Sequence, residues 1–167
     1  MIPLGLSAAI TQRVGNAVGQ KNWEEVRFRG WLGVGVCVGI MSLTASIFIL
    51  SPELIIGLYT SDNAVTDLAI SILWMAALFQ LSDGLQVSSM SALRGLKDTR
   101  IPLLTNLFSY WPVGMGLAYL FGFVWEWGVI SIWGGLIAGL SVAAVLHSLR
   151  FYLLSQVRIP ESQYAQE

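Results

Sequence analysis

Four long runs of the sequence contain almost no charge, and this feature limits most strongly what the chain can fold into. The runs are 30–50, 68–93, 101–125 and 127–149, and the only ionisable carboxylate or imidazole groups in them are Asp83 and His147. About 20 apolar residues cross the roughly 30 Å hydrocarbon core of a bilayer as a helix. None of the runs shows the strict alternation of a barrel strand. The sequence therefore predicts an all-α membrane protein, a polytopic helical bundle with four full transmembrane helices.

The composition agrees with a membrane-embedded chain. Of the 167 residues, 55% are hydrophobic and 11% are charged, and the mean hydropathy is +0.68. Soluble domains carry about 25% charged residues. The net charge of −1 offers no footprint for nucleic acid, so we expect membrane lipid and no nucleic acid as a partner. The single cysteine, Cys37, excludes an internal disulfide framework and is expected to be a small core residue.

One bundle is expected over 1–158, followed by a polar cytoplasmic tail at 159–167. The expected helices cover approximately 1–19, 29–50, 64–93, 100–123 and 128–156. The first helix is partial, because its apolar stretch is too short to span and lacks the basic region of a signal peptide. We favour the second half of a spanning helix, with its first half in preceding sequence, over a helix that lies at the membrane interface.

Charged residues divide between the two ends of such a bundle. The three segments at one end hold all nine basic residues, which are Arg13, Lys21, Arg27, Arg29, Arg94, Lys97, Arg100, Arg150 and Arg158. The loops at the other end hold only acids, which are Glu53, Asp62, Asp67 and Glu126. Cytoplasmic loops are enriched in Lys and Arg. The basic end and the C-terminus are therefore predicted to face the cytoplasm.

Local signals refine the helices. Pro112 lies inside the third span and should kink that helix, because proline removes a backbone hydrogen bond. Asp98 or Thr99 is expected to cap the same helix, with Pro102 in its first turn. Trp125 and Trp127 bracket the outer loop as residues of an interfacial belt would.

Three GxxxG patterns are present in the sequence. They are Gly15/Gly19, Gly35/Gly39 and Gly135/Gly139. Such pairs let helices approach closely. We favour packing within the bundle over specific homodimerisation.

Asp83 is the residue that most needs a functional explanation. It precedes Arg94 by eleven residues, or about 16 Å of helix, which places it close to the bilayer midplane. An aspartate at that depth costs about 2.5–3.5 kcal/mol to insert. We expect it to face the bundle interior or a water-filled cavity.

Helical geometry places Phe79, Gln86 and Met90 on the face of Asp83, with Gln80 at its flank. A carboxylate, amides, an aromatic ring and a thioether suit an amphipathic, often cationic molecule. The face could equally bind a proton or a small cation such as Na⁺, with Asp83 as a possible ligand. The alternative is a structural Asp83 paired with a basic group, for which Arg13 is the one candidate in this chain.

Motifs of enzymes are missing from the sequence. It contains no P-loop, HExxH or GxSxG pattern, and its single histidine, His147, is expected at the membrane interface. We therefore expect a protein that is not an enzyme and has no cofactor.

Two segments resemble a known transporter family. "LFQLSDGLQVSSMSALRGLKDTRIP" and "SYWPVGMGLAYLF" resemble the tenth and eleventh helices of multidrug and toxic compound extrusion (MATE) transporters. "MIPLGLSAAITQRVGNAVGQKNWEEVRF" and "SIWGGLIAGL" resemble the end of the eighth helix with its following loop and the start of the twelfth. The resemblance implies a twelve-helix fold of two lobes. This chain would supply about five helices of the C-terminal lobe, and the remaining N-terminal helices would be its partner.

The resemblance also implies a function, in which inward movement of Na⁺ or H⁺ drives drugs and other xenobiotics out across the bacterial cytoplasmic (inner) membrane. Asp83 matches an acidic position implicated in cation coupling. Some relatives carry Tyr where this chain has Phe79, which removes a hydroxyl ligand. Two alternatives stay open: a lipid-linked sugar flippase of the same superfamily, expected to carry several basic residues in its cavity, and a non-transporting membrane interaction module from a truncated gene.

Overall fold

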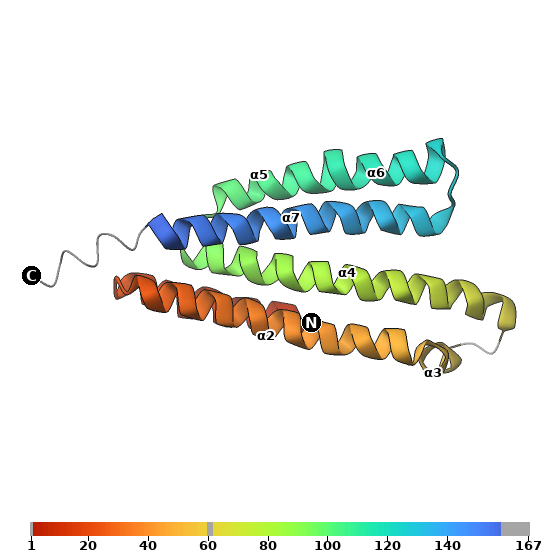
Figure 1. Cartoon of the computed structure of the whole chain (residues 1–167), viewed down its shortest axis with the longest axis horizontal. Helices are drawn as coiled ribbons and strands as arrows, with labels where there is room; N and C mark the ends of the chain where they lie inside the picture. The colour runs from red at the N-terminus through yellow and green to blue at the C-terminus, as the bar shows by residue number, and fades with distance from the viewer. Residues whose placement is uncertain (1, 60–61, 158–167) are drawn as a thin grey trace, which may run out of the picture.

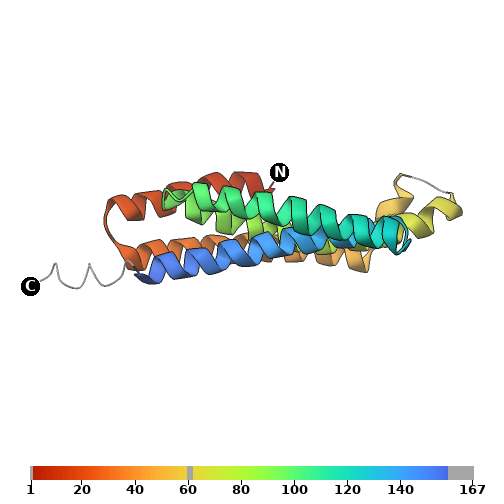
Figure 2. The same cartoon turned by 90° about the horizontal axis from the view of Figure 1, so that it is seen from above.

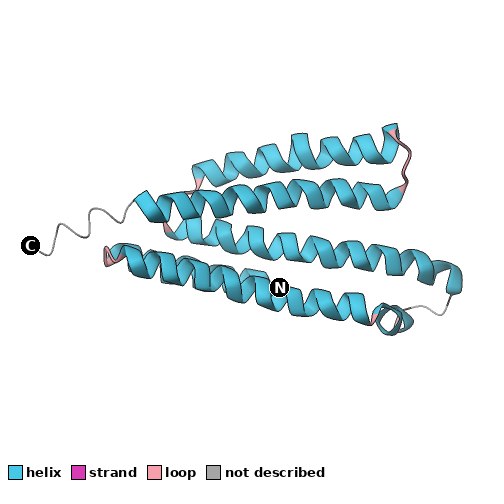
Figure 3. Cartoon of the chain, in the orientation of Figure 1, coloured by secondary structure: helices cyan, strands magenta, loops and turns pink. Residues whose placement is uncertain are grey.

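The computed structural model describes residues 2–59 and 62–157 as a bundle of long helices that run side by side (Figure 1). The elements are α1 (Ile2–Gly19), α2 (Trp23–Leu50), α3 (Pro52–Gly57), α4 (Asn63–Gly95), α5 (Arg100–Phe108), the π-helical η1 (Ser109–Met115), α6 (Gly116–Tyr119), the π-helical η2 (Leu120–Val124) and α7 (Val129–Val157). Short loops join them, and no strand occurs within the described ranges (Figure 3). The all-α fold class is confirmed.

Four of the helical stretches are long and apolar enough to cross a membrane. They are Trp23–Leu50, Val65–Gly95, Arg100–Val124 and Ile130–Gln156. The shorter α1 begins near the middle of the bundle's length, as Figures 1 and 2 show. The four full spans and the partial N-terminal helix are therefore as predicted, while the tail at 159–167 lies outside the described residues.

Helix α2 begins at Trp23, earlier than the expected position 29, because its N-terminus is capped. The side chain of Asn22 accepts a hydrogen bond of 3.1 Å from the backbone N–H of Glu25. Glu24 and Glu25 lie in the first turn, where negative charge favours the helix dipole. Arg27 and Arg29 consequently belong to the helix and not to the preceding loop.

Helix α4 is the central element, and α1, α2 and α7 all pack against it. The rod from α5 to η2 packs on α7 and forms the outer edge of the bundle (Figure 1). Because α1, α4 and α7 end where α2 and α5 begin, the basic residues up to Arg150 lie at one end of the molecule. The ninth, Arg158, lies outside the described residues.

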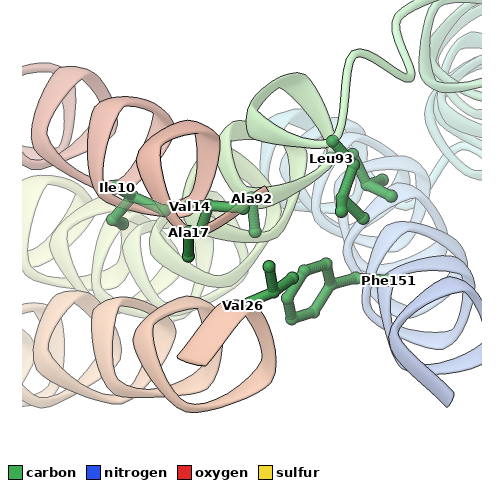
Figure 4. Close-up of a cluster of buried hydrophobic side chains, with 8 residues drawn as sticks. Ile10, Val14, Ala17, Val26, Ala92, Leu93 and Phe151 are labelled. Carbon is green, nitrogen blue, oxygen red and sulfur yellow. The ribbon is translucent and has the colours of Figure 1, made fainter. Parts of the chain in front are cut away.

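Buried apolar side chains gather at this basic end (Figure 4). The cluster comprises Ile10, Val14, Ala17, Val26, Ala92, Leu93, Leu96 and Phe151. Phe151 fits against α2 because position 30 is glycine: a Cβ there would lie 2.2 Å from the Phe151 Cζ atom. The cluster joins α1, α2, α4 and α7 where their ends meet.

The glycine pairs have different surroundings. A Cβ at Gly135 would lie 2.3 Å from the Ala118 nitrogen, and one at Gly139 would lie 2.6 Å from the Gly114 Cα atom. This pair therefore packs α7 closely against η1 and α6, within the bundle. A Cβ at Gly35 or Gly39 would meet no atom within 4 Å, so α2 presents that pair on an open face. In the third pair, a Cβ at Gly15 would lie 3.7 Å from the Gly95 carbonyl oxygen, and a Cβ at Gly19 would meet no atom within 4 Å.

Loop and helix-end predictions have mixed outcomes. Pro112 lies within η1, so wider π-helical turns absorb the lost hydrogen bond. Pro102 lies in the first turn of α5, as predicted. Thr99 occupies the predicted N-cap position of α5, but its side chain makes no cap bond. Asp98 instead pairs with Arg150 on α7, at 2.5 Å. Trp125 and Trp127 both stack on Phe121, with ring centroids 5.3 and 5.5 Å away.

Candidate functional site

Asp83 lies on a cavity of about 610 Å³ that opens between α2, α4 and α7. The cavity is mainly apolar, and its lining residues are Pro3, Met41, Thr44, Phe48, Ala76, Phe79, Gln80, Asp83, Trp133 and Leu136. Three of the residues predicted for the site, Phe79, Gln80 and Asp83, therefore lie together. The structure places them on one stretch of α4, less than two turns long.

Asp83 itself is half-buried and unpaired. Its carboxylate makes no hydrogen bond or ion pair with any residue in the described ranges. Arg13, the candidate partner in this chain, is exposed and forms no ion pair there. The described part of the chain thus offers no support for a structural ion pair at this position. A carboxylate at this depth without a partner binds a proton or a cation readily, because either removes its charge.

Gln80 is held in place by α2. Its amide nitrogen donates hydrogen bonds to the Thr44 hydroxyl and to the Met41 carbonyl oxygen, the latter at 3.2 Å. These bonds fix one end of the side chain at the cavity wall. The amide oxygen makes no hydrogen bond with the described residues, so it remains able to accept one from a ligand or to coordinate a cation.

Aromatic rings from two other helices complete the cavity. Trp133 on α7 meets Phe79 edge to face, with ring centroids 6.1 Å apart and planes at 85°. Phe48 contributes a third ring from α2. Sequence reasoning missed Trp133 and Phe48, because each belongs to another span and no local pattern connects it with Asp83.

Gln86 and Met90, which were also predicted for the site, do not line this cavity. Gln86 is 4% exposed, and its amide nitrogen donates to the Asn106 Oδ1 atom on α5, at 3.2 Å. The Met90 sulfur accepts a contact of 3.5 Å from the Asn106 amide nitrogen. The physical reason is that the Asn106 side chain of α5 contacts both residues, one to two turns nearer the basic end than Asp83.

His147 lies inside the bundle. Its side chain is fully buried, and Nε2 lies 3.3 Å from the Pro102 carbonyl oxygen. The residue therefore joins α7 to α5 inside the bundle. Cys37 is buried and unpaired, as predicted.

Comparison with known proteins identifies the family. The MatE family model matches residues 1–120. A "Probable multidrug resistance protein NorM" of Xanthomonas axonopodis pv. citri is 47% identical over 151 residues, which cover 90% of this chain and 33% of that protein. One of Xylella fastidiosa is 44% identical over 156 residues, covering 93% and 33%. The chain thus spans about a third of the length of these curated relatives.

Solved structures show the same fold. An inward-facing multidrug resistance MATE family transporter of the MOP superfamily superposes with a TM-score of 0.83 at 21% identity, over 95% of this chain and 37% of that one. The eukaryotic MATE transporter AtDTX14 gives a TM-score of 0.82 at 23% identity, over 94% and 36%. The family model matches most of the chain, and the superpositions show the same fold: the chain belongs to the MatE family.

Proposed function

We propose that this chain forms part of an antiporter that exports drugs and other xenobiotics in exchange for Na⁺ or H⁺. One observation carries the proposal: Asp83 presents an unpaired carboxylate, midway along a membrane-length helix, to an apolar cavity. An aspartate in this position costs about 2.5–3.5 kcal/mol to insert. A buried charge that is this costly is expected to serve a function. Exchange of a cation for a drug is such a function.

The coupling ion is proposed to bind at Asp83. Within the described ranges no group of three His, Cys, Asp or Glu side chains could hold a metal. A sodium ion would therefore need neutral oxygens beside the carboxylate, and the Gln80 amide is a candidate that lines the same cavity. Phe79 has no hydroxyl to offer. A proton needs only the carboxylate, and no further cofactor is required for either ion.

The drug is proposed to be an amphipathic cation. Phe48, Phe79 and Trp133 offer aromatic area near a single negative charge, and this combination suits a flat cationic molecule. No lysine or arginine lines the described cavity. The drug exporter is therefore favoured over the lipid-linked sugar flippase.

The proposal includes a place in the cell and partners. We propose that the basic end faces the cytoplasm, with the C-terminus inside, in the bacterial inner membrane. The remaining helices of a full-length transporter and the surrounding lipid would be the partners of this bundle.

A chimeric transporter tests the proposal. The matching third of the Xanthomonas NorM relative is replaced by this chain, and ethidium efflux from energised cells is normalised to inserted protein. Asp83→Asn keeps the size and removes the charge, so we expect coupled efflux to collapse while expression persists. Asp67→Asn, an exposed acid at the outer end, is the matched control and should efflux like the parent. Efflux by Asp83→Asn at the parental rate would show that the carboxylate is not the coupling group.

A further inference from the structure

A second groove, of about 900 Å³, lies between the start of α2 and the end of α7. It opens at the basic end of the bundle, on the side of α2 away from the Asp83 cavity. Residues of α2 that line it are Glu24, Arg27, Phe28, Trp31 and Leu32, and Tyr152 faces them from α7.

One lining residue of this groove, Trp31, contacts the buried core. Phe151 is fully buried against Gly30 of α2, and Figure 4 shows it beside Val26 of the same helix. Trp31 packs edge to face on Phe151, with ring centroids 5.7 Å apart. Phe28 and Tyr152 remain 63% and 47% exposed. The groove is thus an open surface depression, largely apolar, beside the contact between Trp31 and Phe151.

Two charges of opposite sign lie at the mouth of the groove. Glu24 and Arg27 are three residues apart on α2 and so share a face. Neither forms an ion pair in the part of the chain that the structure describes. Their neighbours Glu25 and Arg29 do pair, at 2.5 Å. The two charges at the groove are therefore available to a ligand that carries both signs.

The order of these groups along the groove is chemically specific. Moving from the end of the bundle toward its middle, α2 presents an acid, then a base, then apolar and aromatic side chains. Phosphatidylethanolamine has the same order, with a terminal ammonium, a phosphate one short link deeper, and then acyl chains. An ammonium donates hydrogen bonds to a carboxylate, a guanidinium donates to phosphate, and apolar channels take the chain.

We propose that this groove is a binding site for phosphatidylethanolamine, with the ammonium at Glu24, the phosphate at Arg27 and an acyl chain against Phe28, Trp31 and Tyr152. Phosphatidylcholine fits less well because its quaternary ammonium has no N–H to donate. Phosphatidylglycerol leaves Glu24 unpaired. The site is separate from the cavity at Asp83, and lipid binding there does not require transport activity.

The test measures lipid retention by the purified 167-residue chain. Native mass spectrometry from detergent micelles is performed with phosphatidylethanolamine, phosphatidylcholine or phosphatidylglycerol in equal amounts. We expect phosphatidylethanolamine to be retained preferentially. Glu24→Gln and Arg27→Gln should each lower its retention about fivefold, since one charge at a membrane surface contributes on the order of 1 kcal/mol.

Matched controls separate this site from general electrostatics. Glu53→Gln and Arg100→Gln remove exposed charges elsewhere and should leave retention unchanged. A double variant with Glu24→Arg and Arg27→Glu keeps the net charge but reverses the order, so it should lose the preference. Equal retention of phosphatidylcholine, stronger retention of phosphatidylglycerol, or an unaffected double variant would each overturn the proposal.

Discussion

At the scale of single residues, Gln80 shows how a polar side chain shapes the cavity. Its amide nitrogen donates hydrogen bonds to the Thr44 hydroxyl and the Met41 carbonyl oxygen of α2. The bonds tie α4 to α2 one turn away from Asp83, and they leave the carboxylate itself without a partner. Gln86, by contrast, donates a hydrogen bond to Asn106 inside the bundle and does not line the cavity. Two glutamines less than two turns apart on one helix thus serve different functions.

The aromatic rings of the cavity give a prediction at this scale. Phe79→Ala or Trp133→Ala removes stacking area and no charge, and an aromatic pair contributes about 0.5–1.5 kcal/mol beyond its buried area. In the chimeric transporter, the half-saturating ethidium concentration should rise by about two- to tenfold, while the cation dependence stays unchanged. Trp111→Ala, at an exposed position on η1, serves as the control. A lost cation dependence with unaltered ethidium affinity would contradict the assigned role of these rings.

At the scale of the helices, hydrogen-bonded small residues hold the bundle together. Ser82 bonds Ser141 at 2.8 Å, and Ser89 bonds Ser148 at 2.9 Å. Both bonds join α4 to α7 in the same register, as two parallel helices require. Hydroxyls and glycines replace hydrophobic driving force between membrane helices, because lipid tails are as apolar as the side chains that they would contact.

The glycine pairs provide a matched test of this packing. Gly139→Ala would bring its Cβ to 2.6 Å from the Gly114 Cα atom and 2.7 Å from the Ser109 carbonyl oxygen. Backbone atoms cannot move aside as a flexible side chain can, so we expect a loss of about 1–3 kcal/mol. Gly35→Ala and Gly39→Ala meet open space and should be neutral. The measurement is the midpoint of thermal unfolding in micelles. Equal midpoints for the Gly139 and Gly35 variants would show that α7 and η1 pack less closely than in the structure.

At the scale of the whole molecule, the described lysines and arginines all gather toward one end of the bundle. The described basic residues lie where α1, α4 and α7 end, while Glu53, Asp67 and Glu126 lie at the opposite end. Two of the turns at the basic end contain a lysine with positive φ, Lys21 at 55° and Lys97 at 62°. These short turns force neighbouring helices to return in the opposite direction and so keep the basic residues at one end.

The orientation in the membrane can be measured directly. In a Cys37→Ala background, a cysteine at Trp127 should react with an impermeant thiol reagent added to intact cells, and a cysteine at Gln20 should not. The reason is that loops rich in lysine and arginine remain in the cytoplasm, whereas loops without them are translocated. Permeabilised cells, in which both should react, control for accessibility. Labelling at Gln20 alone in intact cells would show that the topology is the reverse of the one proposed.

Hydropathy predicts the four spans, and the positions of lysine and arginine predict the basic end of the bundle. These are local properties, because hydropathy and helix length depend on residues that follow one another along the chain. The "D-G-L-Q-V" segment and its continuation also pointed to the family. The tertiary structure sets which turns of α4 stay open, because Asn106 on α5 contacts Gln86 and Met90. It likewise brought Trp133 and Phe48 to the cavity. The path of one helix across another depends on side chains distant in sequence, and periodicity within a single helix does not contain that information.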